Sequence, residues 1–350
     1  MKTIVFTGGG TAGHIMPNIA LIESMSDYNI YYLGSDGMEK KILKNYPNVK
    51  FITIPTVKFV RSLTPTNLLI PFKLLHSIKS CNQILKKIKP DIIFSKGGYV
   101  AIPVCLAGKK CNIPTITHES DLSLGLANRI IGRKAKCICC SFENTAMNIG
   151  KNAIFTGTPI RKDILHGNKN VVYLRHNISP TKPIILIVGG SLGARAINEI
   201  ICNNIKLITK DYIVLHIVGK NNIDQSLTKI QDYYQIEFAD DIQNYFSASN
   251  LVISRAGSNT IFELLELNKP MILIPLPKSA SRGDQILNAS KFQNLGYSEV
   301  ILQENLNCEI LLEKIKSTLL NSSKYIKNMK SSKYTNGTQK ILDLIYKYQK

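Results

Sequence analysis

Short apolar runs alternate along the chain with longer segments whose apolar residues recur at helical spacing. These runs predict strands near residues 3–7, 30–33, 51–54, 91–95, 114–118, 136–140, 153–156, 184–188, 213–218, 236–238, 251–253, 271–274 and 299–302. The helical spacing predicts helices over 15–26, 40–45, 67–87, 100–111, 194–208, 222–233, 242–248, 258–267, 285–295 and 308–319. Such alternation is typical of parallel sheets with right-handed crossover connections, so the expected fold class is α/β.

The alternation is interrupted once, near the middle of the chain. Residues 156–161 contain glycine and proline, which interrupt regular structure, and residues 163–183 are polar and irregular. For a chain of 350 residues, two domains are expected, and we place them at 1–160 and 161–334. Apolar residues at 341, 344 and 345 predict a last helix, about 335–350, that packs back on the first domain.

Two glycine-rich turns, residues 7–14 and 189–195, each follow a predicted strand and precede a predicted helix. Glycine permits a tight turn and lets another group approach the backbone, and the helix start presents free N–H groups. We therefore expect two doubly wound domains that face each other across a cleft holding a phosphate-bearing substrate. No clear acidic residue ends the second predicted strand, where residues 33–36 read Leu-Gly-Ser-Asp; this disfavours a dinucleotide site, and no Walker motif is present.

Polar clusters follow several of the predicted strands. In the first domain these are residues 8–14, 95–99 and 118–121, which would converge on one sheet edge. His14 either forms a local hydrogen bond at the helix start or lies near the substrate as a base or donor. In the second domain, Ser258 either caps a helix or marks a helix start that faces a phosphate, with Glu263 binding a ribose diol.

Composition narrows the functional classes. The net charge is +20, and residues 40–90 contain eleven Lys or Arg but no Asp or Glu. Such a region is expected to face nucleic acid or an anionic membrane surface, unless the lysine content is general to the genome. The eight cysteines form no metal-binding pattern and are expected to be reduced core residues of a cytosolic protein. We expect neither a signal peptide nor a membrane-spanning helix.

The order of the motifs makes the chain recognisable. It resembles the GT-B glycosyltransferases of peptidoglycan synthesis, which transfer N-acetylglucosamine (GlcNAc) from UDP-GlcNAc to undecaprenyl-linked muramyl-pentapeptide (lipid I), giving lipid II. The resemblance rests on seven ordered motifs along nearly the whole chain: GGGTAGHIMP at 8–17, SKGGYVAIP at 95–103, HESD and GLAN within 118–128, TGTPIR at 156–161, GGSLGARAIN at 189–198, SRAGSNTIFE at 254–263 and GDQILNA at 283–289.

The resemblance implies a UDP-GlcNAc site formed mainly by the second domain. The uracil would lie against Phe238 and Ala239, the ribose would bind Glu263, and the GlcNAc hydroxyls would contact Gln285 and Asp284. The diphosphate would bind the second glycine turn, one arginine and one helix start, which comprise Gly190, Ser191, Arg161, Ser258, Asn259 and Thr260.

The resemblance places the acceptor on the first domain. Thr11, Ala12 and Gly13 would line the opposite side of the cleft, and Asp121 and Asn128 would join the substrate-binding residues. Two positions depart from the family. Ala12 replaces a frequent glycine and fits only where φ is negative, and Asp121 replaces a frequent asparagine, so an ionised side chain there could only accept hydrogen bonds.

The chemistry that the resemblance implies is an inverting transfer. The acceptor C4 hydroxyl attacks the anomeric carbon from the face opposite the leaving diphosphate, and His14 is the first candidate for the base, with Glu119 the second. Two helix N-termini and Arg161 would stabilise the departing charge, so we expect no metal and no cofactor. No Asp-x-Asp motif lies between the strands, in agreement with this expectation.

The basic region then fits an anionic membrane surface. Leu68, Phe72, Leu75 and neighbouring apolar residues recur at helical spacing, with Lys73 and Lys79 flanking them. An interfacial helix has this pattern, although a core helix shares it. The resemblance implies a peripheral enzyme on the cytoplasmic face of the bacterial plasma membrane, with other cell-wall synthesis proteins as further partners.

Two other interpretations stay open at this level. One is a GT-B relative with another lipid acceptor, or a UDP-sugar epimerase, which would carry further acidic catalytic residues. The other is a basic nucleic-acid-binding protein, which explains the charge but none of the ordered motifs and lacks helix-turn-helix or RNP signatures. We therefore expect no nucleic acid among the partners.

Overall fold

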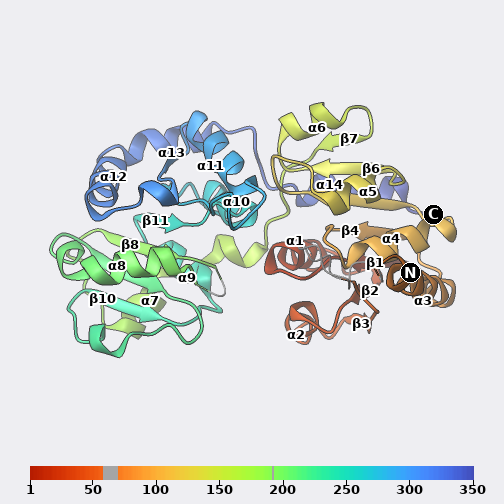
Figure 1. The fold of residues 1–350 in the computed structure, drawn as a ribbon, viewed down its shortest axis with the longest axis horizontal. Coiled ribbons are helices and arrows are strands. Elements are labelled where there is room, and N and C mark those ends of the chain that lie inside the picture. Colours follow the sequence, from red (N-terminus) through yellow and green to blue (C-terminus); the bar gives the residue numbers. More distant parts are fainter. Residues whose placement is uncertain (58–69, 191–192) are drawn as a thin grey trace. The chain divides into compact units, whose positions relative to one another are not determined.

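The computed structural model describes residues 1–57, 70–190 and 193–350. The chain divides into two compact units, one formed by Met1–Arg161 with Tyr334–Lys350 and the other by Lys162–Lys333. Each unit contains one parallel sheet with helices packed against it (Figure 1). The predicted α/β class is therefore confirmed for both units.

The sheet of unit 1 has seven parallel strands in the order β3-β2-β1-β4-β5-β6-β7. The strands are β1 Lys2–Thr7, β2 Tyr28–Gly34, β3 Val49–Thr53, β4 Ile92–Ser95, β5 Thr115–Glu119, β6 Cys137–Cys140 and β7 Ala153–Phe155. The helices are α1 Ala12–Ile22, α2 Met38–Leu43, α3 Ile70–Ile88, α4 Ala101–Lys110, α5 Leu126–Gly132, α6 Glu143–Ile149 and α14 Thr338–Tyr348. The order reverses at β1, so β1 and β4 mark the point where ligands of such sheets bind.

The last helix, α14, belongs to the core of unit 1. Its residues Ile341, Leu342 and Ile345 are buried in one cluster with Ile4 and Phe6 of β1. Figure 1 shows this helix, in blue, among the elements of unit 1. The two ends of the chain are therefore held together by the burial of apolar side chains from both.

The sheet of unit 2 has six parallel strands in the order β10-β9-β8-β11-β12-β13. The strands are β8 Ile184–Val188, β9 Ile213–Ile217, β10 Tyr233–Ile236, β11 Leu251–Ser254, β12 Met271–Leu273 and β13 Ser298–Val300. The α-helices are α7 Lys169–His176, α8 Arg195–Ile208, α9 Ile242–Ala248, α10 Ser258–Glu266, α11 Asp284–Asn294, α12 Cys308–Leu320 and α13 Ser322–Lys330, and the 3-10 turns are η2 Lys162–His166, η3 Gln225–Leu227 and η4 Gln303–Asn305.

Two sequence predictions in unit 2 are wrong. The helix predicted over 222–233 is only the short turn η3, because Asp224 caps it by accepting from Ser226 N and because Asp232, at φ 62°, turns the chain into β10. The segment 163–183, expected to be irregular, contains α7. Asn168 caps the start of that helix, and Asn177 in the left-handed region ends it.

Candidate functional site

The first glycine turn connects β1 to α1 and packs against the buried carboxylate of Glu39. Gly10 N and Ser35 N both donate to Glu39, at 3.4 and 2.8 Å, and a Cβ on Gly9 would lie 2.7 Å from Glu39 Cδ. Glu39 is fully buried at the start of α2. The backbone of the turn is therefore shaped by this side chain, which the sequence analysis did not identify.

His14 lies in the first turn of α1 and makes a local contact. Its Nδ1 lies 3.0 Å from Thr11 Oγ1, and the ring is half-buried. Ala12 is the first residue of α1 and does not have positive φ, so it fits where the family often has glycine. Thr11, Gly13 and His14 thus occupy one accessible helix start, at the carboxyl end of β1.

The second cluster, after β4, lies against the first. Gly97 and Gly98 have φ values of 80° and 77°, a region that glycine adopts readily. A Cβ on Gly98 would lie 3.3 Å from the His14 ring and 3.0 Å from Gly9 O. The structure therefore brings residues 8–14 and 95–99 together, as the sequence predicts for neighbouring strands.

The third cluster, after β5, is centred on Glu119, which is only 5% exposed. Its Oε2 accepts from Asn128 Nδ2 at 3.0 Å and Gly125 N at 2.9 Å, and its Oε1 accepts from Asp121 N at 3.1 Å. Burial, together with the Asp121 carboxylate, raises the pKa of Glu119. Asn128 also accepts from Thr117 and donates to His118 O, so its amide is engaged at both ends.

His118, within the same motif, is directed away from this cluster. It is fully buried, and its Nε2 lies 3.1 Å from Gly157 O, so this nitrogen donates to the carbonyl. Burial lowers the pKa of His118 well below its usual value. His118 therefore ties β5 to the segment that ends in Arg161, the last residue of this part of unit 1.

In unit 2, the residues predicted to bind UDP-GlcNAc follow the ends of adjacent strands. Ser254 at the end of β11 pairs with Val188 at the end of β8, so the second glycine turn and the start of α10 lie on one sheet edge. Gly190 is exposed with φ 94°, and Ser191 lies outside the described residues. The first turn of α10 is half-buried and contains Ser258, Asn259 and Thr260.

Ser258 does not cap α10. Gly257 occupies the cap position, no side chain caps this helix start, and Ser258 is the first helical residue. The interpretation of Ser258 as a capping residue is therefore wrong, because the helix begins one residue earlier than that interpretation requires. Because the cap residue is glycine, no cap side chain stands between this helix start and an anion.

The other residues predicted to bind UDP-GlcNAc lie beside this sheet edge. Phe238, which is 55% exposed, and Ala239 follow β10. Glu263 is half-buried within α10. Asp284 and Gln285 begin α11, which follows β12, and Gln285 Oε1 accepts from Leu276 N at 3.1 Å. All of these side chains lie in loops or helices that follow strands of one sheet.

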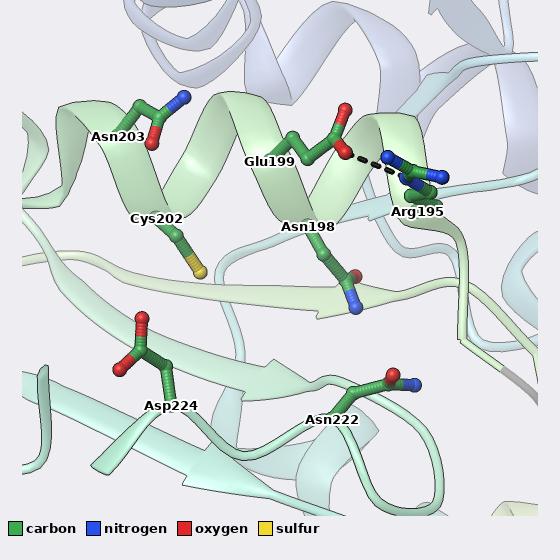
Figure 2. Close-up of a pocket in the computed structure, with 7 residues that line it drawn as sticks. All are labelled: Arg195, Asn198, Glu199, Cys202, Asn203, Asn222 and Asp224. Atoms are coloured by element: carbon green, nitrogen blue, oxygen red, sulfur yellow. Dashed lines mark hydrogen bonds and ion pairs between the residues drawn. The ribbon is translucent and has the colours of Figure 1, made fainter. Parts of the chain in front are cut away.

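A pocket of about 380 Å³ lies elsewhere in unit 2 (Figure 2). Arg195, Asn198, Glu199, Cys202 and Asn203 of α8 line it together with Asn222 and Asp224. Arg195 and Glu199 form an exposed ion pair at 2.7 Å along one face of the helix. None of the predicted site residues lines this pocket, so the pocket is not the predicted UDP-GlcNAc site.

The membrane prediction concerns α3, whose two ends differ. Phe72 and Leu75 are 72% and 60% exposed, and Lys73 and Lys79 are exposed beside them. Further along the helix, Ile78, Cys81 and Leu85 are buried in the core of unit 1, in one apolar cluster with Ile93 and Val104. Leu68 lies outside the described residues. One part of α3 is therefore a core helix and the other presents apolar side chains to solvent.

Membrane-spanning helices and metal clusters are both absent from the part of the chain that the structure describes. Within residues 1–57, 70–190 and 193–350, none of the helices combines the length and the apolar character that spanning a bilayer requires. Over the same residues, no three or more His, Cys, Asp or Glu side chains are grouped so that they could hold a metal ion.

The chain belongs to glycosyltransferase family 28: residues 4–140 match the N-terminal domain of that family and residues 184–345 match its C-terminal domain. A Clostridium tetani protein is 44% identical over 99% of this chain and 98% of its own length. A Lachnospira eligens protein is 44% identical over 99% of both chains. Both are named UDP-N-acetylglucosamine--N-acetylmuramyl-(pentapeptide) pyrophosphoryl-undecaprenol N-acetylglucosamine transferase.

A solved structure agrees with this assignment. The crystal structure of Acinetobacter baumannii MurG superposes with a TM-score of 0.77 at 26% identity, over 99% of this chain and 100% of that one. The fold is therefore GT-B-like, as the ordered motifs predict, and the chain is a glycosyltransferase.

Proposed function

We propose that this protein transfers GlcNAc from UDP-GlcNAc to the C4 hydroxyl of lipid I with inversion, giving lipid II for peptidoglycan synthesis. The observation that carries the proposal is 44% identity over the full length to proteins named for this transfer. The site geometry agrees with it, because the ordered motifs lie where strands of the two sheets end. Sheets of this kind bind ligands at those ends.

Unit 2 would bind the donor. The start of α10 and the turn after β8 would hold the diphosphate, since helix-start N–H groups and the helix dipole favour an anion. Phe238 offers an exposed aromatic face for the uracil, and Glu263 offers a carboxylate for the ribose hydroxyls. Gln285 and Asp284 would contact the sugar, and Arg161 would add a positive charge to the departing diphosphate.

Unit 1 would bind the acceptor. The acceptor oxygen forms a bond to the anomeric carbon as the bond from that carbon to the UDP oxygen breaks, and UDP leaves with the electron pair. The proton of the C4 hydroxyl passes to a base. His14 is the first candidate, because its helix start is accessible and the ring is only half-buried. Glu119 is the second, because its carboxylate ends β5 at the same sheet edge and burial raises its pKa.

The proposal includes neither a metal nor an organic cofactor. The N-termini of α8 and α10 together with Arg161 would supply the stabilisation of the leaving diphosphate. We test this by measuring transfer in the presence of a chelator and after adding back magnesium. Equal rates support the proposal, whereas a rate that depends on magnesium would overturn this part of it.

We also place the protein as a peripheral enzyme on the cytoplasmic face of the plasma membrane. The exposed Phe72 and Leu75 with neighbouring Lys73 and Lys79 combine apolar surface with positive charge, which is the combination that anionic bilayers bind. A lipid-linked acceptor requires the enzyme to work at such a surface.

The experiment that separates this function from an epimerase uses UDP-GlcNAc with and without a lipid I analogue. Proton NMR of the products distinguishes a β1-4-linked disaccharide from a sugar inverted at C2. Transfer that requires the acceptor supports the proposal. Conversion of UDP-GlcNAc to its epimer in the absence of acceptor would replace it with the epimerase alternative.

A further inference from the structure

Lys96 is a buried cation for which the proposed reaction assigns no task. It follows β4 directly and is only 3% exposed. Its backbone N–H donates to Thr7 O at 2.9 Å, and a Cβ on Gly8 would lie 3.0 Å from Lys96 Cβ. The side chain is therefore packed beneath the first glycine turn, between β1 and the end of β5.

The ammonium group lies among the charged residues of the third cluster. Lys96 Nζ donates to Ser120 Oγ, and Ser120 is the residue that follows Glu119. Ser95 of β4 pairs with Thr117 of β5, so Lys96 enters the cluster from the strand beside Glu119. A buried ammonium is costly unless negative charge lies nearby, and here that charge comes from Glu119 and Asp121.

The ionisable groups around Glu119 come from three neighbouring strands. Lys96 follows β4 and is the cation, Asp121 is the second carboxylate, and Cys140 of β6 is a thiol whose pKa burial raises to about 12. His118 is buried and neutral. Lys96 is therefore the one positive charge among these groups, and it opposes both burial and Asp121.

We propose that Lys96 is a positioning residue whose buried ammonium keeps the Glu119 carboxylate ionised, so that Glu119 can accept hydrogen bonds from Asn128 and the backbone and can accept a proton. The second half of this role depends on the proposed function, but the electrostatic pairing of Lys96 and Glu119 does not. Lys96 itself does not touch the reacting atoms in this scheme.

The sign of the effect follows from the charges. The ammonium favours the ionised carboxylate and lowers the pKa of Glu119, whereas burial and Asp121 raise it. Without the ammonium, only the hydrogen bonds from Gly125 and Asn128 oppose the rise in the Glu119 pKa that burial and Asp121 cause. Burial also lowers the pKa of Lys96 to about 8, so the ammonium loses its proton in mildly alkaline solution.

The test is a carbon-13 NMR titration of the glutamate carboxyl groups, with Glu119 assigned by Glu119→Gln. In Lys96→Met the titration midpoint of Glu119 should rise, as expected for loss of a nearby opposite charge. Lys110→Met is the matched control, because Lys110 is an exposed lysine at the end of α4. An unchanged midpoint in Lys96→Met overturns the proposal.

Two further readouts keep the proposal testable if Lys96→Met does not fold. Lys96→Gln keeps a polar group beside Ser120 and should give the same rise. In the unaltered protein, the Glu119 carboxyl signal should show a second, smaller inflection near pH 8, where Lys96 loses its proton. Absence of that inflection contradicts the pairing without any variant.

The activity measurement separates this inference from the proposed function. If Glu119 is the base, the acid limb of the kcat/KM profile should move in Lys96→Met by the same amount as the NMR midpoint. A shifted NMR midpoint with an unmoved acid limb supports the pairing and removes Glu119 as the base. Failure of the unaltered protein to transfer GlcNAc leaves the NMR result intact and rejects only the function.

Discussion

The carboxylate of Glu39 occupies the space that a side chain on Gly9 would need: a Cβ there would lie 2.7 Å from Glu39 Cδ. Glu39 cannot move aside without losing its hydrogen bonds from Ser35 N and Gly10 N. The first glycine turn therefore depends on a residue in α2, far from it in sequence.

Gly9→Ala should lower the free energy of unfolding by about 1–3 kcal/mol, through overpacking and loss of the buried hydrogen bonds of Glu39. Gly257→Ala is the matched control, because open space surrounds Gly257 and its φ is −67°, and it should cost less than about 1 kcal/mol. Urea unfolding measures both. In a Glu39→Ala background the cost of Gly9→Ala should shrink, and strictly additive costs would contradict the account.

Asn128→Ala should reduce both stability and activity. It removes the amide that donates to Glu119 and His118 O and that accepts from Thr117, with an expected loss of about 3 kcal/mol. Asn152→Ala is the control, since Asn152 also donates to backbone carbonyls of unit 1 but does not contact Glu119. Steady-state kinetics should show a larger loss of kcat/KM for Asn128→Ala, and equal losses would argue against a role for Glu119.

Unit 2 should lose stability in acid through His216. Its Nε2 donates to Asn198 Oδ1, its Nδ1 accepts from Tyr233, and burial lowers its pKa to about 3. Because the unfolded chain binds the proton more readily, stability falls as the pH drops below 6.5, by about 2 kcal/mol between pH 7 and pH 5.

His216→Gln should remove that contribution, so its stability should depend less on pH over this range than that of the unaltered protein. His166→Gln is the control, because His166 is exposed. Denaturant unfolding at pH 7 and pH 5 measures the difference. Identical pH dependence in the His216→Gln variant and the unaltered protein would show that His216 is not the group responsible.

Glu263→Ala should raise the KM for UDP-GlcNAc by about 10- to 100-fold, the loss expected for one or two hydrogen bonds to a charged group, with the fold intact. Glu266→Ala is the control, because Glu266 is the next acidic residue of α10 and is not assigned to the ribose. It should leave the KM for UDP-GlcNAc within about twofold of the original. An unchanged KM in Glu263→Ala refutes its assignment to the ribose.

The double variant Phe72→Ser, Leu75→Ser should weaken binding to vesicles that contain anionic lipid, because it removes the exposed apolar side chains of α3. Leu174→Ser is the control, since Leu174 is 84% exposed but lies in unit 2. Vesicle sedimentation at two salt concentrations measures both contributions. Equal binding by both variants would place the membrane contact elsewhere.

Much of the fold could be predicted from sequence because buried parallel strands are continuous apolar runs, as in residues 184–188 and 251–253. The prediction of a helix over 222–233 was wrong because Asp224 and Asp232 redirect the backbone locally. Glu39 was not recognised, and Lys96 was recognised only as part of the cluster 95–99, since the burial of both depends on the order β2-β1-β4-β5, which no local pattern specifies. A charged residue directly after a buried strand is the signal that could have identified Lys96.

The central claim is the transfer itself, and the most direct measurement is the movement of radiolabelled GlcNAc from UDP-GlcNAc to a lipid I analogue by the purified protein without added metal. The account predicts label in a β1-4-linked disaccharide lipid. If UDP-GlcNAc binds but no label reaches lipid I, the claim is contradicted, and the acceptor must be another lipid or the reaction an epimerisation.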